Sequence, residues 1–122
     1  MNVEIMIYVD NEIENAKFFK QAFGGSLYEE TMFDESKKMT LVLEDSVSLV
    51  FFKRSFIEQV SPEVLSNRPS LLFQVENVED VYRKITNLKQ NVSELSYLES
   101  KRTFNFSDLE NNYYAIIEKK YR

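Results

Sequence analysis

The sequence repeats itself at a spacing of 66 residues. Adding 66 to positions 4–11 leads to positions 70–77, with matched apolar positions and an acidic residue followed by Asn at the end of both segments. The same spacing takes 43–54 onto 109–120, and 35–38 matches 99–102 at a spacing of 64, as a small loop deletion would produce. Because 122 residues allow one compact domain or two packed halves, the repeat predicts two similar modules in tandem.

Each half has the pattern of a strand, a helix and three further strands, which predicts an α+β fold of two βαβββ modules. Module 1 is expected at about 1–53, a linker at 54–69 and module 2 at 70–122. Ser61-Pro62-Glu63 resembles a helix start and predicts a short helical turn in the linker. The expected strands are 3–9, 26–33, 38–43 and 46–53 around a helix at 12–23, then 70–75, 93–99, 102–106 and 113–119 around a helix at 78–89.

The amino acids that are absent exclude most familiar catalytic apparatus. The chain has no Cys and no His, so it has no disulfide, thiol nucleophile, Ser-His-Asp triad or imidazole metal ligand. Its two glycines, Gly24 and Gly25, are adjacent, so neither a GxGxxG turn nor a Walker-type phosphate loop can be built. We therefore expect no cofactor of the nucleotide-binding kind.

Charge and hydropathy point to a cytoplasmic protein. The longest apolar runs are five residues, far below the roughly 20 that span a bilayer, and the N-terminus does not resemble a secretory signal. The net charge of −5 repels nucleic-acid backbones and favours a neutral or cationic small molecule as partner. We expect neither nucleic acid nor a membrane as partner.

Several local motifs resemble those of one known superfamily. The opening strand and helix carry Tyr8-Val9-Asp10-Asn11, Ala16-Lys17-Phe18-Phe19 and Ala22-Phe23-Gly24, and the second half opens with Phe73-Gln74-Val75-Glu76-Asn77-Val78. Asp108-Leu109-Glu110-Asn111-Asn112 is similar to an Asp-Pro-x-Gly-Asn turn with its Pro and Gly replaced. Over the whole chain the sequence resembles the vicinal oxygen chelate superfamily, which includes glyoxalase I, extradiol dioxygenases, and fosfomycin- and bleomycin-resistance proteins. The resemblance implies paired βαβββ modules that form curved sheets around a ligand cavity, often in a homodimer.

The resemblance also implies where a metal would be held. Metal-dependent members carry one ligand, usually His, Gln or Glu, on the first and last strand of each module. The matching positions here are Glu4, Leu49, Ser70 and Ala115, with Ser48 in place of Leu49 if the register is one residue off. Leu and Ala cannot bind a metal and Ser is a poor ligand, so we expect no metal and no metal cofactor.

Alternation along the strands predicts which side chains face the implied cavity. Residues that share parity with the four ligand positions mix aromatic and aliphatic surface with polar groups, as small-molecule sites do. The alternative is that the same residues fill a second core without any ligand. The predicted ligand-binding residues are Glu4, Met6, Tyr8, Leu49, Phe51, Ser70, Leu72, Gln74, Tyr113, Ala115 and Ile117, with Val47 on the same face. Ile5, Ile7, Val9, Val50, Phe52 and their counterparts in the second half are expected to pack under the helices.

Three functions are compatible with this pattern. The first is a metal-free protein that binds or sequesters a cationic or aromatic compound such as an antibiotic, as the resemblance to bleomycin-resistance proteins implies. The second is a metal-independent lyase or isomerase that uses Glu4 as general base and Tyr8 or Tyr113 as acid, the only proton-transfer groups on the inward faces. The third is a structural dimer with a vestigial pocket, in which the segment from Lys53 to Pro69 permits domain swapping.

Overall fold

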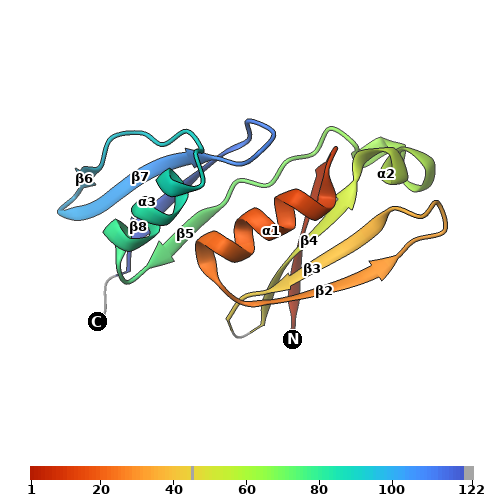
Figure 1. Cartoon of the computed structure of the whole chain (residues 1–122), viewed down its shortest axis with the longest axis horizontal. Coiled ribbons are helices and arrows are strands. Elements are labelled where there is room, and N and C mark those ends of the chain that lie inside the picture. Colours follow the sequence, from red (N-terminus) through yellow and green to blue (C-terminus); the bar gives the residue numbers. More distant parts are fainter. Residues whose placement is uncertain (45, 120–122) are drawn as a thin grey trace. The chain divides into compact units, whose positions relative to one another are not determined.

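The structure, a computed structural model, describes residues 1–44 and 46–119. It divides into two compact units, one ending at Pro69 and the other beginning at Ser70. Each unit is a four-stranded mixed sheet with a helix across one face (Figure 1). Among the described residues, no helix is long and apolar enough to cross a membrane. The predicted α+β fold of two βαβββ modules is confirmed.

The first unit follows the predicted order of elements. Its sheet has the order β1-β4-β3-β2, in which β1 runs parallel to β4 and the other neighbours are antiparallel. After the last strand, the chain turns into one short α-helix and one 3₁₀ turn within the segment expected to be a linker. The elements are β1 (Val3–Val9), α1 (Glu12–Phe23), β2 (Ser26–Thr31), β3 (Lys37–Val42), β4 (Val47–Lys53), α2 (Arg54–Val60) and η1 (Pro62–Val64).

The second unit repeats this topology with shorter elements. Its sheet has the order β5-β8-β7-β6, again with the first strand parallel to the last. The strand predicted at 93–99 is reduced to three residues. The Ser93 N–H donates to the Asn105 carbonyl, but the Asn105 N–H donates to the Ser93 hydroxyl and not to a backbone carbonyl, so the regular ladder is interrupted there. The elements are β5 (Leu72–Val75), α3 (Val78–Asn87), β6 (Ser96–Leu98), β7 (Lys101–Ser107) and β8 (Tyr113–Glu118).

The two long helices begin in the same way. The Asn11 side chain accepts a hydrogen bond of 3.1 Å from the Glu14 backbone N–H, and Asn77 accepts one of 3.0 Å from Asp80. An Asn at this position satisfies an N–H group that has no partner within the helix. Asn11 and Asn77, at equivalent places in the repeat, therefore fix where α1 and α3 start.

Each helix packs its apolar side on its own sheet. In the first unit the ring of Phe19 on α1 lies 5.4 Å from that of Phe51 on β4, and both side chains are fully buried. In the second unit Tyr82 on α3 meets Phe104 on β7 edge to face at 5.0 Å. These contacts place the core of each unit between helix and sheet, which leaves the opposite face of each sheet for other uses.

The two adjacent glycines after α1 give a matched test of the turn. Gly24 and Gly25 have φ of +83° and +96°, where an L side chain is strained by about 1–3 kcal/mol. A Cβ on Gly24 would meet nothing within 4 Å, whereas one on Gly25 would lie 2.5 Å from the Val42 carbonyl oxygen. We expect Gly25→Ala to lower the free energy of unfolding by at least about 1 kcal/mol more than Gly24→Ala in urea titrations. Equal losses would show that the chain relaxes away from Val42.

Candidate functional site

The face of the first sheet that α1 does not cover carries three rows of side chains across its four strands. We call it the open face of the first sheet. Residues paired in register project to the same side of a sheet, so the pairing of β1, β4, β3 and β2 defines each row. The rows are Glu4, Ser48, Val42 and Ser26; Met6, Val50, Thr40 and Tyr28; and Tyr8, Phe52, Lys38 and Glu30.

The prediction that Val47, Leu49 and Phe51 lie on this open face is wrong. Leu49 pairs with Ile5 and Phe51 with Ile7, so all of them point toward α1, where Leu49 is 1% and Phe51 0% exposed. Val47 pairs with Val3 on the same side. Their neighbours Val50 and Phe52, expected under the helix, lie on the open face instead.

A one-residue difference in the repeat explains the error. Met6 pairs with Val50 in the first unit, and Leu72 pairs with Ala115 in the second. The first strands are therefore 66 apart (72 − 6), but the last strands are 65 apart (115 − 50). A spacing of 66 applied to β4 exchanges its two faces, because side chains alternate with a period of two.

The second sheet has an open face of its own, and the predicted residues share it. Leu72 pairs with Ala115, Gln74 with Ile117, and Tyr113 with Ser107, all on the side opposite Phe104 and α3. The exposed fraction of these side chains varies widely, from 62% for Tyr113 to 9% for Ile117. Ser70 precedes β5 and is exposed.

The donor set does not fit the metal that the resemblance implies. Leu49 faces away from Glu4, and its neighbour Ser48 on the open face is a neutral hydroxyl. In the second unit Ser70 and Ala115 offer at most one further hydroxyl. Among residues 1–44 and 46–119, no group of three or more Asp, Glu, His or Cys side chains could hold a metal ion. No chemical step through a metal is therefore derived.

An aromatic cluster closes one end of the first open face. The rings of Phe52 and Phe56 stack at 5.8 Å with planes 8° apart, and Phe33 lies 5.2 Å from Phe56. The ammonium of Lys38 lies 6.0 Å from the centroid of Phe52, within reach of a cation–π contact. Phe33, in the turn after β2, remains 71% exposed. Sequence reasoning missed this cluster because it placed Phe52 under α1.

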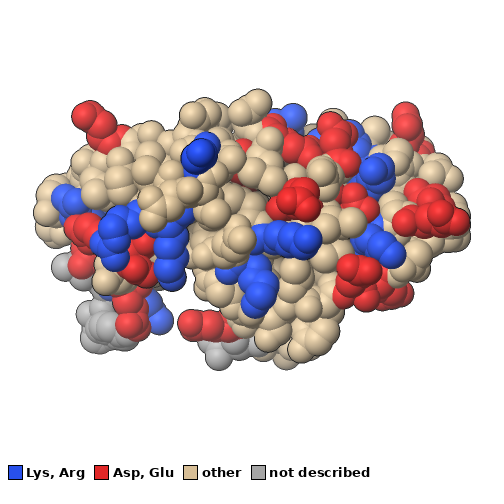
Figure 2. All heavy atoms as spheres, in the orientation of Figure 1, with Lys and Arg blue, Asp and Glu red and all other residues tan. Residues whose placement is uncertain are grey.

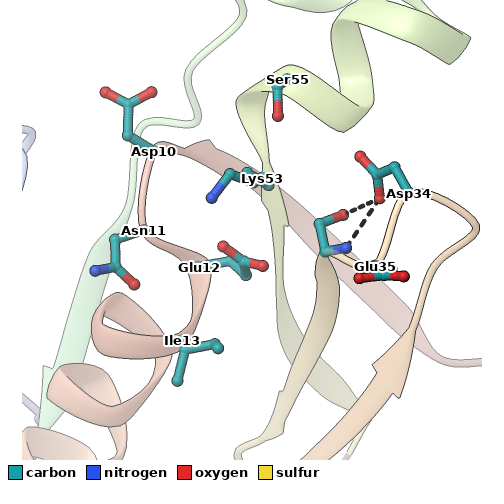
Figure 3. Close-up of a pocket in the computed structure, with 9 residues that line it drawn as sticks. Asp10, Asn11, Glu12, Ile13, Asp34, Glu35, Lys53 and Ser55 are labelled. Atoms are coloured by element: carbon teal, nitrogen blue, oxygen red, sulfur yellow. Dashed lines mark hydrogen bonds between the residues drawn. The ribbon is translucent and has the colours of Figure 1, made fainter.

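A separate hollow of about 410 Å³ lies in the first unit where α1 begins (Figure 3). Because β1 and β4 are parallel, their carboxyl ends lie at the same end of the sheet, and the β2–β3 turn lies at that end as well. The sequence analysis assigned no chemistry to these segments, and no sequence motif joins them. The lining residues are Asp10, Asn11, Glu12, Ile13, Asp34, Glu35, Ser36, Lys53 and Ser55.

The carboxylates around this hollow are held by neighbours within the unit. The buried Glu12 accepts a hydrogen bond of 2.7 Å from the Lys37 backbone N–H, and Asp10 pairs with Arg54 at 3.4 Å. Asp34 accepts hydrogen bonds from the hydroxyl and the N–H of Ser36 (Figure 3). These contacts connect α1, the β2–β3 turn and α2, so they account for the carboxylates as structural groups.

The hydrogen bond from the Ser36 hydroxyl is the main cause that lowers the pKa of Asp34 below its ordinary value. We expect Ser36→Ala to raise that pKa toward the ordinary value, measured from the carboxyl ¹³C shift in an NMR pH titration. Because the pKa is lowered in the folded state, Asp34 stabilises the fold at neutral pH, and this contribution disappears as the pH falls through the lowered pKa. An unchanged pKa would assign the shift to the backbone N–H groups and to the Gln59 side chain, which also donate to Asp34.

Charges of both signs are interspersed on the face of the molecule that Figure 2 shows, and neither sign forms one continuous patch. The net charge of −5 is therefore not concentrated at one visible site. Specific charges, rather than the overall balance, decide what each open face attracts.

Comparison with solved structures of the same architecture identifies the fold. An antibiotic-binding protein from Streptomyces sp. CB03234, TnmS3, matches with a TM-score of 0.75 at 16% identity, over 98% of this chain and 96% of that one. A glyoxalase/bleomycin resistance protein/dioxygenase superfamily member from Sphaerobacter thermophilus DSM 20745 matches with a TM-score of 0.75 at 14% identity, over 98% and 97%. The chain has the vicinal oxygen chelate fold. FosX, a fosfomycin resistance protein from Listeria monocytogenes, matches with a TM-score of 0.71 at 15% identity, over 98% of this chain and 93% of that one.

The likeness to proteins with the vicinal oxygen chelate fold lies in structure rather than in sequence. No family model matches the sequence, and no curated protein matches it. The FosX structure is a complex with Mn(II) and sulfate, so the fold occurs in a metal-bound protein as well as in the antibiotic-binding protein. The function therefore has to be inferred from the side chains on the open faces.

Proposed function

We propose that this chain is a metal-free protein that binds a small aromatic or charged molecule on the open faces of its sheets. The observation that carries the proposal is the composition of the first open face. Tyr8, Tyr28 and Phe52 supply aromatic surface, and Glu4 and Lys38 supply opposite charges at its two ends. Apolar and aromatic surface with a few polar groups is typical of small-molecule sites.

The second open face, taken by itself, supports the same proposal. It offers the exposed side chains of Leu72, Gln74 and Tyr113 beside the smaller Ala115. Ile117 is nearly buried and would contribute only an edge. The residues proposed to contact a ligand are Glu4, Met6, Tyr8, Phe52, Leu72, Gln74, Tyr113 and Ala115, with Ser70 at the start of β5.

Binding is favoured over acid–base catalysis by the spacing on β1. Glu4 and Tyr8 are four residues apart on one strand, which separates them by about 13 Å. An acid and a base that act on one bond must both lie within hydrogen-bond reach of the reacting atoms. Glu4 is also exposed, so we propose that it is a ligand contact and not a general base.

The antibiotic-binding protein with the same fold supports the proposal, since it is a protein of this fold that binds a small molecule. Among the described residues, no group of three or more Asp, Glu, His or Cys side chains is placed to hold a metal ion, which supports metal independence. We further propose a homodimer, as the resemblance implies, and a cytoplasmic location, as the charge and hydropathy of the sequence favour.

Native mass spectrometry of freshly purified, untagged protein tests this proposal. We expect no stoichiometric divalent metal, two chains per particle, and at least one retained or added compound after incubation with a panel of aromatic and charged small molecules. Phe52→Ala should reduce the bound fraction, while Phe23→Ala, which removes a half-buried ring from α1, should not. A stoichiometric metal that EDTA removes would overturn metal independence. Binding of no compound in the panel would overturn the binding function.

A further inference from the structure

We propose that the ligand of the first open face is an aromatic compound with an anionic group, and that this group pairs with Lys38. The inference rests on the proposed function and adds the chemical class of the ligand. It reverses the sign of charge that the net charge of −5 suggested for a ligand.

Lys38 lies in the third row of the open face, and no anionic partner is found for it among residues 1–44 and 46–119. Glu30 is directly opposite on β2, yet the two side chains form no ion pair in the part of the chain that the structure describes. The Lys38 ammonium instead lies over the ring of Phe52, and the residue is half-buried. Its charge is therefore held beside apolar surface.

Other lysines of the same unit differ from Lys38 in this respect. Lys37 pairs with Glu29 at 3.5 Å, Lys17 pairs with Glu14 at 3.8 Å, and Lys20 donates a hydrogen bond of 2.7 Å to the Gly25 carbonyl. Lys53, on the α1 side of the sheet, lines the hollow together with four carboxylic acids. Lys38 is thus the lysine whose surroundings are aromatic and whose charge is available on the open face.

The aromatic surface that begins at Phe52, beside this charge, extends further over the open face. Tyr8 is the direct neighbour of Phe52 on β1, and Phe56 stacks on Phe52 from α2. Phe33 extends the cluster and exposes 71% of its surface. Rings exclude water, so a charged pair formed beside them is stronger than one in open solvent. A planar ring with a carboxylate would use both features.

The other end of the open face fixes the orientation of such a ligand. Glu4 lies in the first row, about 13 Å along β1 from Tyr8, and would repel an anion there. The anionic group is therefore directed to the third row, to the side of Lys38 that faces Phe52 and not Glu30. A cationic group on the same ligand would be directed to Glu4.

Three matched probes test the inference by NMR: 2-naphthoate, the neutral 2-naphthamide and the cationic 2-naphthylmethylammonium. We expect naphthoate to bind about tenfold more tightly than naphthamide, as one charge-assisted hydrogen bond provides, with backbone shifts confined to β1, β3 and β4. Lys38→Gln should remove this preference and Lys38→Arg should keep it. Lys17→Gln, which makes the same change of charge on the exposed side of α1, should leave it intact.

The outcomes separate the two proposals. If all probes bind the open face but naphthylmethylammonium binds best, or if Lys38→Gln leaves the naphthoate affinity unchanged, the assignment to Lys38 is wrong and the binding function stands. If the probes shift only residues of β5, β7 or β8, the assignment to Lys38 is wrong and the binding function stands. If none of the three probes shifts residues of either open face, both proposals are overturned. A tenfold preference that is lost only in Lys38→Gln supports both.

Discussion

Phe51→Ala is expected to lower the free energy of unfolding by about 4 kcal/mol, the largest effect that we predict for a single residue. The Phe51 ring is fully buried against Phe19 of α1, so its removal leaves a cavity that the sheet cannot close. Such a loss is a large part of the total stability of a small domain. Urea denaturation followed by circular dichroism measures it.

The neighbouring variant Phe52→Ala is the matched control. Phe52 is half-buried on the opposite face, so its loss should reduce stability by about 1–2 kcal/mol and affect ligand binding instead. The opposite pattern, with a stable Phe51→Ala protein that no longer binds ligand, would restore the face first predicted from the sequence and contradict the strand register.

Asp108→Ala is expected to lower the free energy of unfolding by about 3 kcal/mol, because it leaves several buried N–H groups without an acceptor. The Asp108 side chain is 1% exposed in the turn between β7 and β8. Its carboxylate accepts hydrogen bonds of 2.8 Å from the Glu110 N–H, 3.0 Å from the Asn112 N–H and 3.1 Å from the Asn112 side chain. Thermal and urea unfolding measure the loss.

Asp108→Asn provides the control for this turn. Its amide oxygen can still accept the two backbone hydrogen bonds. We therefore expect the free energy of unfolding to fall by about 1 kcal/mol, through loss of the hydrogen bond from the Asn112 amide. Equal losses in the two variants would show that the carboxylate charge, and not the number of acceptors, stabilises the turn.

The sequence was sufficient to predict the repeated βαβββ order, because each signal involved is local. Asn11 and Asn77 start their helices through side chains three residues from the N–H groups that they satisfy. The turn at 108–112 forms without a glycine, since Asn111 adopts a φ of +66°, which Asn tolerates.

The faces of β4 could not be predicted in the same way. Leu49, Val50, Phe51 and Phe52 are all apolar, so alternation gives no sign of which side is covered, and a repeat spacing changed by one residue exchanges the two sides. The acidic hollow was missed for another reason. Its lining comes from segments up to 45 residues apart, from Asp10 to Ser55, which only the sheet topology brings together.

Arg54 limits how far the two units of one chain can separate. It donates hydrogen bonds to the Tyr8 and Leu65 carbonyls, at 3.0 and 3.4 Å, and ties the segment after β4 to the first unit. The Asn67 N–H also donates a hydrogen bond of 2.9 Å to the Val64 carbonyl, so residues 68 and 69 remain as a tether before Ser70, with a reach of about 11 Å from Asn67 when fully extended. Such a tether gives each unit an effective concentration in the millimolar range toward the other unit of its own chain. Dilution lowers the concentration of a second chain but leaves this intramolecular concentration unchanged.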